Sequence, residues 1–346
     1  MNRKNYILQV LGRFIWFFIF SGVIIATCII VENNGPAEII YNNESFNYTS
    51  WTPTNFTAEN NIIFDAHSHT IYSDGVLSVE QNILWHIAHG YNACAITDHN
   101  TLNHKSDLEK MAAKYLDKII VILGMEWTTK RIHMNFIGIS EWNDPIPSNP
   151  TDDQIKEAIN KAHAQNAIVI VNHIPWSLAR GMNHPSRQQL LEWNVDYIEV
   201  VNEGDLDTES YYNWCNNSGG FGMITGTDMH RPNKVYGWTG LNVTEFTAEA
   251  VLNQLRARNT TIYYNETGAD DYAVGEENPA YKIIKPMALI GELFENYEVN
   301  GKLDWQGIGI FAGYMIGVFI ISEILRILNR KFWDKINSKR QIAKTE

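Results

Sequence analysis

Two histidines that lie two residues apart, His67 and His69, are the first side chains in this sequence that could bind a metal ion. They follow an apolar stretch at residues 62–66, which is typical of a buried strand. Residues two apart in a strand point to the same face, so both imidazoles could address one ion. Imidazole nitrogens suit borderline metals such as zinc. An incidental H-x-H in a chain with 11 histidines would look the same, so the pair needs support from elsewhere.

That support comes from further chemically able residues beside other apolar stretches. An Asp-His pair at a strand end also occurs as ordinary turn chemistry, but here the pattern repeats along the chain. The residues beside such stretches are Asp98, His99, Glu126, His133, His173, Asp228 and His230. Burying polar groups at the ends of apolar strands is costly unless they are paired or bind a metal. The repetition therefore predicts one shared metal site. Histidines 86, 89, 104, 163 and 184 lie on predicted helices or loops, where ordinary packing or solvation is expected.

The motifs, taken in order, resemble those of the PHP (polymerase and histidinol phosphatase) family. They are D-x-H-x-H-T-x-x-S-D-G at 65–75, I-T-D-H-N at 96–100, G-M-E-W at 124–127, His133, N-H-I-P at 172–175 and G-T-D-M-H at 226–230. The resemblance covers about residues 61–265. It includes 248–258 and 260–263, which resemble the family's closing helix and strand.

The resemblance implies a trinuclear centre of divalent metals, with zinc, manganese or iron as the candidates. By resemblance, one ion takes His67, His69, Glu126 and Asp228, Glu126 bridges to a second ion held also by His133 and His173, and Asp74, His99 and His230 hold the third. The sequence departs from the family's frequent His-Pro pair at His173, which Ile174 separates from Pro175.

Such a centre favours hydrolysis of phosphoesters. Three divalent ions bring more positive charge than Asp74, Glu126 and Asp228 remove, so the site would attract anions. A metal-activated hydroxide could attack phosphorus while the metals hold the attacking and leaving oxygens, and no serine or cysteine nucleophile is needed. Asp228 and His230 are the ligands expected to be catalytic, together with Arg231.

Three arginines are the candidates for substrate contact, although exposed arginines are usually only solvated. Arg231 directly follows His230, and Arg180 and Arg187 lie in the loop region after His173. Among carboxylates, Glu199 is expected to hold a ligand histidine by a hydrogen bond, and Asp65 and Asp98 could do the same.

The elements that must position these residues alternate between strands and helices. Apolar runs at 62–66, 93–97, 119–123, 134–139, 167–171, 197–201 and 223–226 read as strands. Helices are expected at 78–89, 105–116, 152–165 after the cap Thr151, and 248–258. This alternation predicts an α/β domain at 61–268. The expected fold is a distorted (β/α)7-type, PHP-like barrel, whose chemistry gathers at strand ends.

Two apolar segments at 14–31 and 306–325, uncharged over 14–31 and 306–322, are long enough to cross a bilayer. The first could instead be a cleavable signal peptide, and the second a buried core helix. We interpret both as retained transmembrane helices that flank the catalytic domain. The remaining segments are a cytoplasmic N-terminus (1–13), a solvated stalk (32–60), a juxtamembrane connector (269–305) and a basic tail (326–346).

Charge sets the expected topology. Basic residues precede the first segment and follow the second, at Arg3, Lys4, Arg13, Arg326, Arg330, Lys331, Lys335, Lys339, Arg340 and Lys344. Between the segments acidic residues outnumber basic ones, and the first basic residue is Lys105. Glycosylation sequons begin there at Asn43, Asn47, Asn55, Asn216, Asn242, Asn259 and Asn265. These features predict a two-pass cell-membrane protein with both termini cytoplasmic and its catalytic domain outside.

Three other functions, an amidohydrolase, a receptor and a nucleic-acid-binding protein, fit the sequence less well. A metal-dependent amidohydrolase would use similar ligands, but no strand-end lysine suited to carbamylation is evident. A non-catalytic receptor with structural metals would have an incomplete ligand set. The acidic domain disfavours nucleic-acid polymers, so the expected substrate is a phosphorylated small molecule or surface component. Glycines 309, 313 and 317 form a stripe that could support a weak homodimer in the membrane.

Overall fold

The computed structural model describes residues 3–52, 60–215, 220–296 and 302–342. The sequons at Asn55 and Asn216, and Lys344 in the basic tail, lie outside these residues. The chain divides into two compact units. A helical unit comprises Met1–Glu38, Asn278–Tyr297 and Gly301–Glu346, and a sheet unit comprises Ile39–Glu277.

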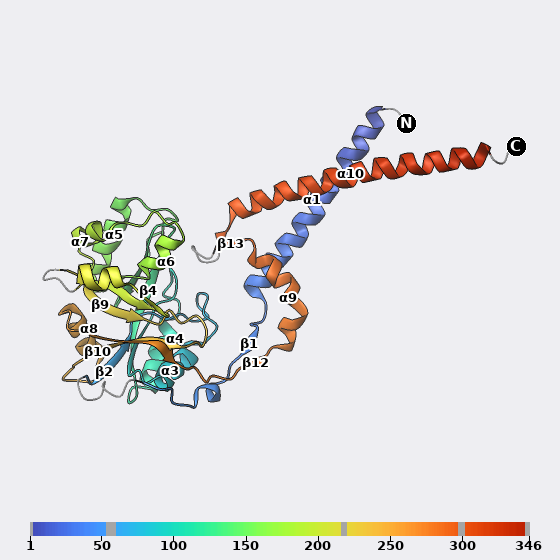
Figure 1. Ribbon diagram of the computed structural model, residues 1–346. Coiled ribbons are helices and arrows are strands. Elements are labelled where there is room, and N and C mark those ends of the chain that lie inside the picture. Colours follow the sequence, from blue (N-terminus) through green and yellow to red (C-terminus); the bar gives the residue numbers. More distant parts are fainter. Residues whose placement is uncertain (1–2, 53–59, 216–219, 297–301, 343–346) are drawn as a thin grey trace. The chain divides into compact units, whose positions relative to one another are not determined.

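The sheet unit is built on one curled sheet (Figure 1). Its strands are β2 (Ile62–Asp65), β3 (Ala93–Ile96), β4 (Ile120–Thr128), β5 (His133–Ile137), β6 (Ile168–Val171), β7 (Tyr197–Asn202), β8 (Asp205–Leu206), β9 (Gly222–Gly226), β10 (Val235–Leu241) and β11 (Thr261–Ala269). The order along the sheet is β11-β10-β2-β3-β4-β5-β6-β7-β8, and β9 also pairs with β7. The curl brings β9 beside β10, which is near the first edge of the sheet. Thr225 N of β9 donates to Thr239 Oγ1 of β10 at 2.9 Å.

The predicted α/β fold is confirmed, with one difference in strand direction. The β2-β3-β4 and β6-β7-β9 pairings are parallel, as strand–helix alternation predicts. Strand β5 instead runs antiparallel to both β4 and β6 and follows β4 without a helix. The sheet is therefore mixed, and it forms a half-barrel rather than a regular (β/α)7 array.

Helices connect and cover the strands. Four of them, α3, α4, α5 and α8, begin within one residue of the predicted start, whereas the short α6 and α7 were not predicted. The helices of this unit are α3 (Val79–Ala88), α4 (Lys105–Lys114), α5 (Asp152–His163), α6 (Ile174–Ala179), α7 (Arg187–Glu192) and α8 (Ala248–Arg256), with a π-helical segment at Ser210–Cys215. Ser78 and Thr151 each form a capping box at the start of α3 and α5. These caps define the first turns of α3 and α5.

Strand β10 was not predicted, although it lies between β2 and β11. Its sequence, VYGWTGL, carries two glycines that weaken the strand signal. The structure gives the reason for one of them: a Cβ at Gly237 would lie 2.8 Å from Val201 Cγ1. Close packing against β7 thus excludes a larger residue.

Part of the segment expected to be a solvated stalk packs on the sheet unit. A short helix at Asn43–Phe46 brings Phe46 to 4% exposure. Phe46 joins the cluster of Trp85 and Trp238, and Ser50 N donates to Ala88 O at 2.7 Å. Strand β1 (Ile39–Ile40) pairs with β12 (Glu276–Glu277). One phenylalanine without an apolar period gave no sequence signal for this packing.

The helical unit contains α1 (Arg3–Asn34), α9 (Pro279–Glu292) and α10 (Trp305–Ile342), with the short pair β13 (Glu295–Asn296) and β14 (Lys302–Leu303). Helices α1 and α10 are long and apolar enough to cross a membrane, at Asn5–Asn34 and Trp305–Ile336. A bidentate ion pair joins them, with Arg13 Nε 2.7 Å and Nη2 2.6 Å from the oxygens of Glu323. Helix α9 lies within the predicted connector and was not expected.

Candidate metal centre

The structure brings all nine predicted ligands together. They lie at or just beyond the ends of β2, β3, β6 and β9, within β4, at the start of β5, and in the loop after β2. Ligand atoms within 4.8 Å of one another form three groups. The groups are His69, Asp74, His99 and His230; His67, His69 and Asp228; and Glu126, His133 and His173.

The first two histidines converge on one carboxylate. His67 Nε2 and His69 Nε2 lie 3.2 and 3.1 Å from Asp228 Oδ1, and 3.0 Å from each other. Two ring nitrogens and a carboxylate oxygen at these separations surround a space that a cation can fill. The alternation of side chains beyond β2 therefore places His67 and His69 as predicted.

Glu126 faces more than one group. Its Oε1 lies 3.1 Å from His133 Nδ1 and 3.4 Å from His173 Nε2, while its Oε2 lies 3.5 Å from His67 Nε2. The carboxylate is fully buried. Strand β4 runs on to Thr128, beyond the predicted end at residue 123, and this extension carries Glu126 into the centre. The position suits a bridging ligand.

The third group surrounds Asp74. Asp74 Oδ2 lies 3.2 Å from His99 Nε2, and Asp74 Oδ1 lies 3.3 Å from His230 Nε2. The ring of His69 stacks on both, with centroids 4.4 Å from His99 and 4.2 Å from His230. His69 thus borders this group as well as that of His67, whereas the resemblance assigned it to one ion only.

Carboxylates behind the ligands hold them in place. Glu199 Oε1 lies 3.0 Å from His67 Nδ1, and Glu199 Oε2 accepts from His173 N at 2.9 Å. Hydrogen bonds of this kind fix the tautomer and the orientation of a ligand histidine. Glu199 therefore has the geometry expected of a support for two ligands.

Asp65 and Asp98 do not hold ligand rings directly. They pair with two histidines that were expected to have ordinary packing roles: His86 Nε2 lies 2.9 Å from Asp65, and His104 Nδ1 lies 3.0 Å from Asp98. Asp98 also accepts from Thr70 N and Oγ1, both at 2.7 Å. These bonds tie the loop after β2 to the end of β3.

Two ligands occupy strained backbone conformations. His173 has φ +27° and Asp228 has φ +51°, in the left-handed region that residues other than glycine rarely adopt. Such strain persists only where the surroundings enforce it, and it clusters at functional sites. Asp228 N donates to His67 O at 2.9 Å, which helps to hold the turn after β9.

The buried charges shift one another's pKa values. Burial opposes ionisation of Asp228, but His67 and His230 outweigh it and hold the pKa of Asp228 well below its ordinary value. Burial, followed by His230 and His99, lowers the pKa of His69 to about 4. Burial alone would lower the pKa of His230, but Asp228 and Asp74 raise it to about 9. The carboxylates therefore raise the pKa of some histidines of the centre, whereas burial lowers that of others.

The donor set fits divalent metals. Within the described residues, the buried ring nitrogens His69 Nδ1, His133 Nε2 and His173 Nδ1 make no hydrogen bond. A buried polar atom without a partner is costly, and a cation among imidazole and carboxylate ligands would relieve part of that cost. Histidine with carboxylate suits zinc, manganese or iron.

The three arginines differ in what they contact. Arg187 is held by Asp207, with Nη2 3.0 and 2.7 Å from its two oxygens, and it also donates to Ser210 Oγ at 2.6 Å. Its guanidinium is therefore engaged in a structural ion pair rather than open to a phosphate. Arg231 is exposed and directly follows His230.

Arg180 lies over the ring of Trp176, with its Cζ 5.1 Å from the ring centroid. Trp176 in turn packs against the rings of His133 and His173, at 5.6 and 5.0 Å. Sequence reasoning missed Trp176, because an aromatic residue directly after a motif carries no distinctive signal. A hollow opens beside it, lined by His173, Pro175, Trp176, Glu199, Asn202, Glu203, Asp205 and Asp207.

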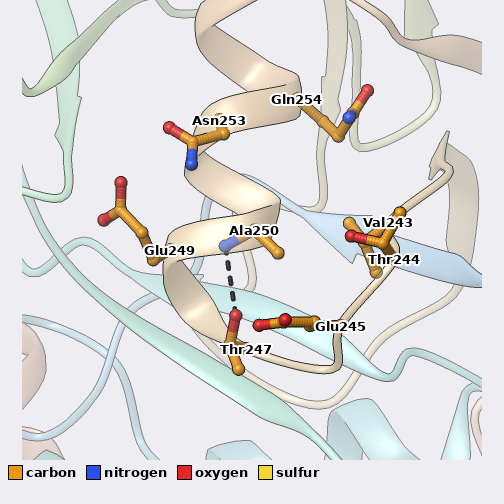
Figure 2. A pocket seen from close by; sticks show the side chains of 8 residues that line it. All are labelled: Val243, Thr244, Glu245, Thr247, Glu249, Ala250, Asn253 and Gln254. Carbon is orange, nitrogen blue, oxygen red and sulfur yellow. Dashed lines mark hydrogen bonds between the residues drawn. The ribbon is translucent and has the colours of Figure 1, made fainter.

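A second hollow lies at the start of α8 (Figure 2). It is lined by Val243, Thr244, Glu245, Thr247, Glu249, Ala250, Asn253 and Gln254. Thr247 caps the helix by accepting from Ala250 N at 3.2 Å. None of the nine candidate ligands lines it, so it is separate from the metal centre.

Comparison with known proteins agrees with the motifs. A family model of the PHP domain matches residues 65–265, which is more than half of the chain. No curated protein sequence matches the chain.

Solved structures provide further likenesses. A two-domain protein from Bacteroides vulgatus, which contains a predicted PHP-like metal-dependent phosphoesterase, aligns over 63% of this chain and 68% of its own, with 20% identity and a TM-score of 0.50. That likeness supports the fold. A candidate metal-dependent phosphoesterase from Bifidobacterium adolescentis aligns over 56% of this chain and 96% of its own, with 16% identity and a TM-score of 0.40. An amidohydrolase from Chromobacterium violaceum with bound sulfate and no metal aligns over 58% and 97%, with 14% identity and a TM-score of 0.37.

Proposed function

The chain belongs to the PHP domain family, and on that premise we propose that it hydrolyses phosphoesters at a trinuclear metal centre while anchored in a membrane. The observation that carries the proposal is the sharing of ligands between neighbouring groups. Glu126 faces His67 through one oxygen and His133 and His173 through the other. Shared carboxylates are how multinuclear hydrolytic centres hold their ions close together.

In this proposal each group of side chains would hold one ion. His67, His69 and Asp228 would hold the first, with Glu126 shared between it and the second. His133 and His173 would complete the second, and Asp74, His99 and His230 the third. Divalent ions at such a centre supply Lewis acidity and lower the pKa of water, which gives a nucleophile near neutral pH.

The protein's own residues would prepare this chemistry. The depressed pKa values of Glu126 and Asp228 keep both carboxylates ionised and able to bind cations at neutral pH. Glu199 would hold His67 and His173 in fixed orientations. Arg231, beside His230, would contact the phosphate and stabilise the charge that builds up in the transition state.

The alcohol part of the substrate would enter the hollow beside His173. The Trp176 ring offers an apolar face there, and Glu203 and Asp205 place carboxylates in the lining. Carboxylates would repel a second anionic group and accept hydrogen bonds from hydroxyl or amino groups. A small phosphorylated molecule fits this lining better than a polyanion does.

The membrane part of the proposal follows from α1 and α10. Their apolar windows are only 6% buried, whereas a core helix of a soluble protein would be mostly covered. With basic residues clustered towards the N-terminal end of α1 and the C-terminal end of α10, the proposed topology has both termini cytoplasmic and the catalytic domain outside. Weak self-association through Gly309, Gly313 and Gly317 stays a prediction, and the structure leaves space beside each of them.

The proposal is tested with the full-length chain purified in detergent. Reconstitution with zinc, manganese or iron and a screen of phosphomonoesters, phosphodiesters and nucleotides should give a metal-dependent phosphoesterase activity. Chelation should abolish that activity, and returning the metal should restore it. A metal-loaded chain that cleaves an amide but no phosphoester would support an amidohydrolase instead, and a chain inert to both would support the receptor.

A further inference from the structure

Helix α9 packs one face on α1. Ala288 and Gly291 are buried on that face. A Cβ on Gly291 would lie 2.4 Å from Cys28 O, and one on Gly35 would lie 2.7 Å from Ile284 Cδ1. The two helices therefore approach closely along a stretch from Gly35 to Cys28, where only small residues fit.

A second apolar stripe of α9 is left open. Ile283 is 82% exposed, Ile290 40% and Leu293 66%, and Pro286 lies between them. The spacing of three, four and three residues puts these side chains on one side of the helix. Lys285 and Glu292 occupy the polar side, and Lys285 Nζ lies 2.6 Å from Glu38. Exposed Lys282 lies at the edge of the open stripe in the first turn of α9, where a long side chain can carry its charge to the headgroups. A helix with two apolar faces and a narrow polar side is poorly suited to water.

Two contacts show how far the end of α9 lies along the long helices α1 and α10. Gly291 meets α1 at Cys28, which lies about 9 Å from the end of α1 at Asn34, at 1.5 Å per residue. The ring of Phe294, just after α9, packs edge-on against Phe311 at 5.1 Å. Phe311 likewise lies about 9 Å into α10 from Trp305. Two independent contacts thus place the end of α9 at the same depth.

We propose that α9 is an interfacial helix that inserts Ile283, Pro286, Ile290 and Leu293 into the bilayer leaflet entered by α1 and α10. The inference rests on the proposed membrane anchoring. The open stripe faces away from α1, and because α9 is packed on α1, lipid that surrounds α1 would also reach this stripe. Because α9 runs beside α1 from Gly35 towards Cys28, it would enter the leaflet along α1 and not lie flat. Lys285 would remain at the level of the headgroups, and Glu292, on the same polar side, would face away from the acyl chains.

The experiment uses the full chain with Cys28, Cys94 and Cys215 replaced by alanine. An environment-sensitive fluorophore is attached to a single new cysteine in Ile290→Cys, in Lys285→Cys as the matched control on the polar side, or in Ile19→Cys within the span of α1. Each protein is reconstituted in phosphatidylcholine vesicles. Quenching is measured with nitroxide-labelled lipid and with aqueous iodide.

The label of Ile290→Cys should be quenched by nitroxide lipid and be at least about threefold less sensitive to iodide than that of Lys285→Cys. The label of Ile19→Cys should be quenched by lipid only. Equal iodide quenching of the Ile290 and Lys285 labels, with the Ile19 label still in lipid, would overturn the interfacial helix and leave the anchoring intact. An Ile19 label that nitroxide lipid does not reach would overturn both.

Coverage by a second copy gives a different pattern. The Ile290 label would then be shielded from iodide, unquenched by lipid, and in energy transfer with labels on other copies, and this result contradicts the proposal. A measurement on the unmodified chain guards against misfolded variants. Photoactivatable phosphatidylcholine should crosslink to peptides spanning residues 283–293, and adducts confined to α1 and α10 would contradict insertion of α9.

Discussion

The sheet unit and the helical unit distribute the same residue types in opposite ways. Trp85, Trp127 and Trp238 are at most 1% exposed in the sheet unit, whereas Trp16 and Trp305 are 71% and 74% exposed in the helical unit. The sheet unit also buries ionisable side chains, the histidines and carboxylates around Glu126. This contrast is what the proposed membrane anchoring predicts, because the two units would then meet different solvents. Water surrounds the first, where burial of apolar groups stabilises the fold, and lipid is the solvent expected for the second.

Replacing Glu126, the carboxylate that faces more than one ligand group, should have the largest effect on the metal centre of the sheet unit. Glu126→Ala leaves the histidines around it without their counter-charge and deprives two proposed ions of a ligand. We expect phosphoesterase activity to fall by at least about 10³-fold, with a loss of bound metal. Elemental analysis and kinetics on the same sample check this. Normal metal content with normal activity would show that Glu126 is not a ligand.

Replacing one buried and one exposed tryptophan by alanine should show how much burial stabilises each unit. Trp238→Ala creates a cavity in the sheet unit and should lower its free energy of unfolding by about 3–5 kcal/mol. Trp16→Ala removes an exposed ring and should change the stability of the sheet unit by less than about 0.5 kcal/mol. Denaturant unfolding in detergent, followed by fluorescence, measures both. Equal losses would contradict the different solvents assigned to the two units.

Arg231→Ala should separate substrate contact from metal binding. The side chain is exposed and is not among the groups able to hold an ion. We expect kcat/KM to fall about 10- to 100-fold while metal content stays normal. Arg187→Ala is the matched control, since Arg187 is paired with Asp207, and it should affect stability more than turnover. Loss of metal in Arg231→Ala would refute this division of roles.

Metal loading should depend on pH through His230. The raised pKa of this residue, about 9, means that its metal-free ring is protonated at neutral pH. A metal ion binds only the neutral ring, so binding must release the proton. Burial opposes protonation of His99, but Glu126 and Asp74 outweigh it and hold its pKa well above the ordinary value, so a second proton must leave as well. The apparent affinity of the Asp74, His99 and His230 group should therefore rise with pH by about tenfold per pH unit for each proton released, and the part due to His230 should level off above pH 9. Calorimetry in buffers of different ionisation enthalpy would detect the proton, and pH-independent binding without proton release would contradict the assignment.

An element could be predicted from the sequence where a local pattern of residues sets it, and not where it depends on distant packing. Alternating apolar stretches and caps such as Thr151 predicted most elements, because local patterns set them. The motifs predicted which residues meet around Glu126, because strand ends of one sheet share an edge. Strand β10 and the buried Phe46 were missed, since their packing depends on partners far along the chain. Helix α9 was missed because its two apolar faces blur the amphipathic period.

The chemistry of substrate contact was less predictable. The sequence offered three arginines, with Arg231 favoured by its place beside His230, yet only the structure shows that Asp207 engages Arg187 and that Trp176 supports Arg180. Ion pairs between distant loops leave no local pattern. The ligand roles and the number of ions stay predictions, because the structure shows side chains that converge and not the ions they would hold.

The central claim is tested most directly by metal content and kinetics measured together on the wild type and Asp228→Ala. The account predicts about three divalent ions in the active wild type. In Asp228→Ala it predicts fewer ions and a loss of phosphoesterase activity, with the fold retained, since the core is formed by the apolar strands and not by the site. Full phosphoesterase activity in metal-free Asp228→Ala protein, or an active wild type with only trace metal, would contradict it.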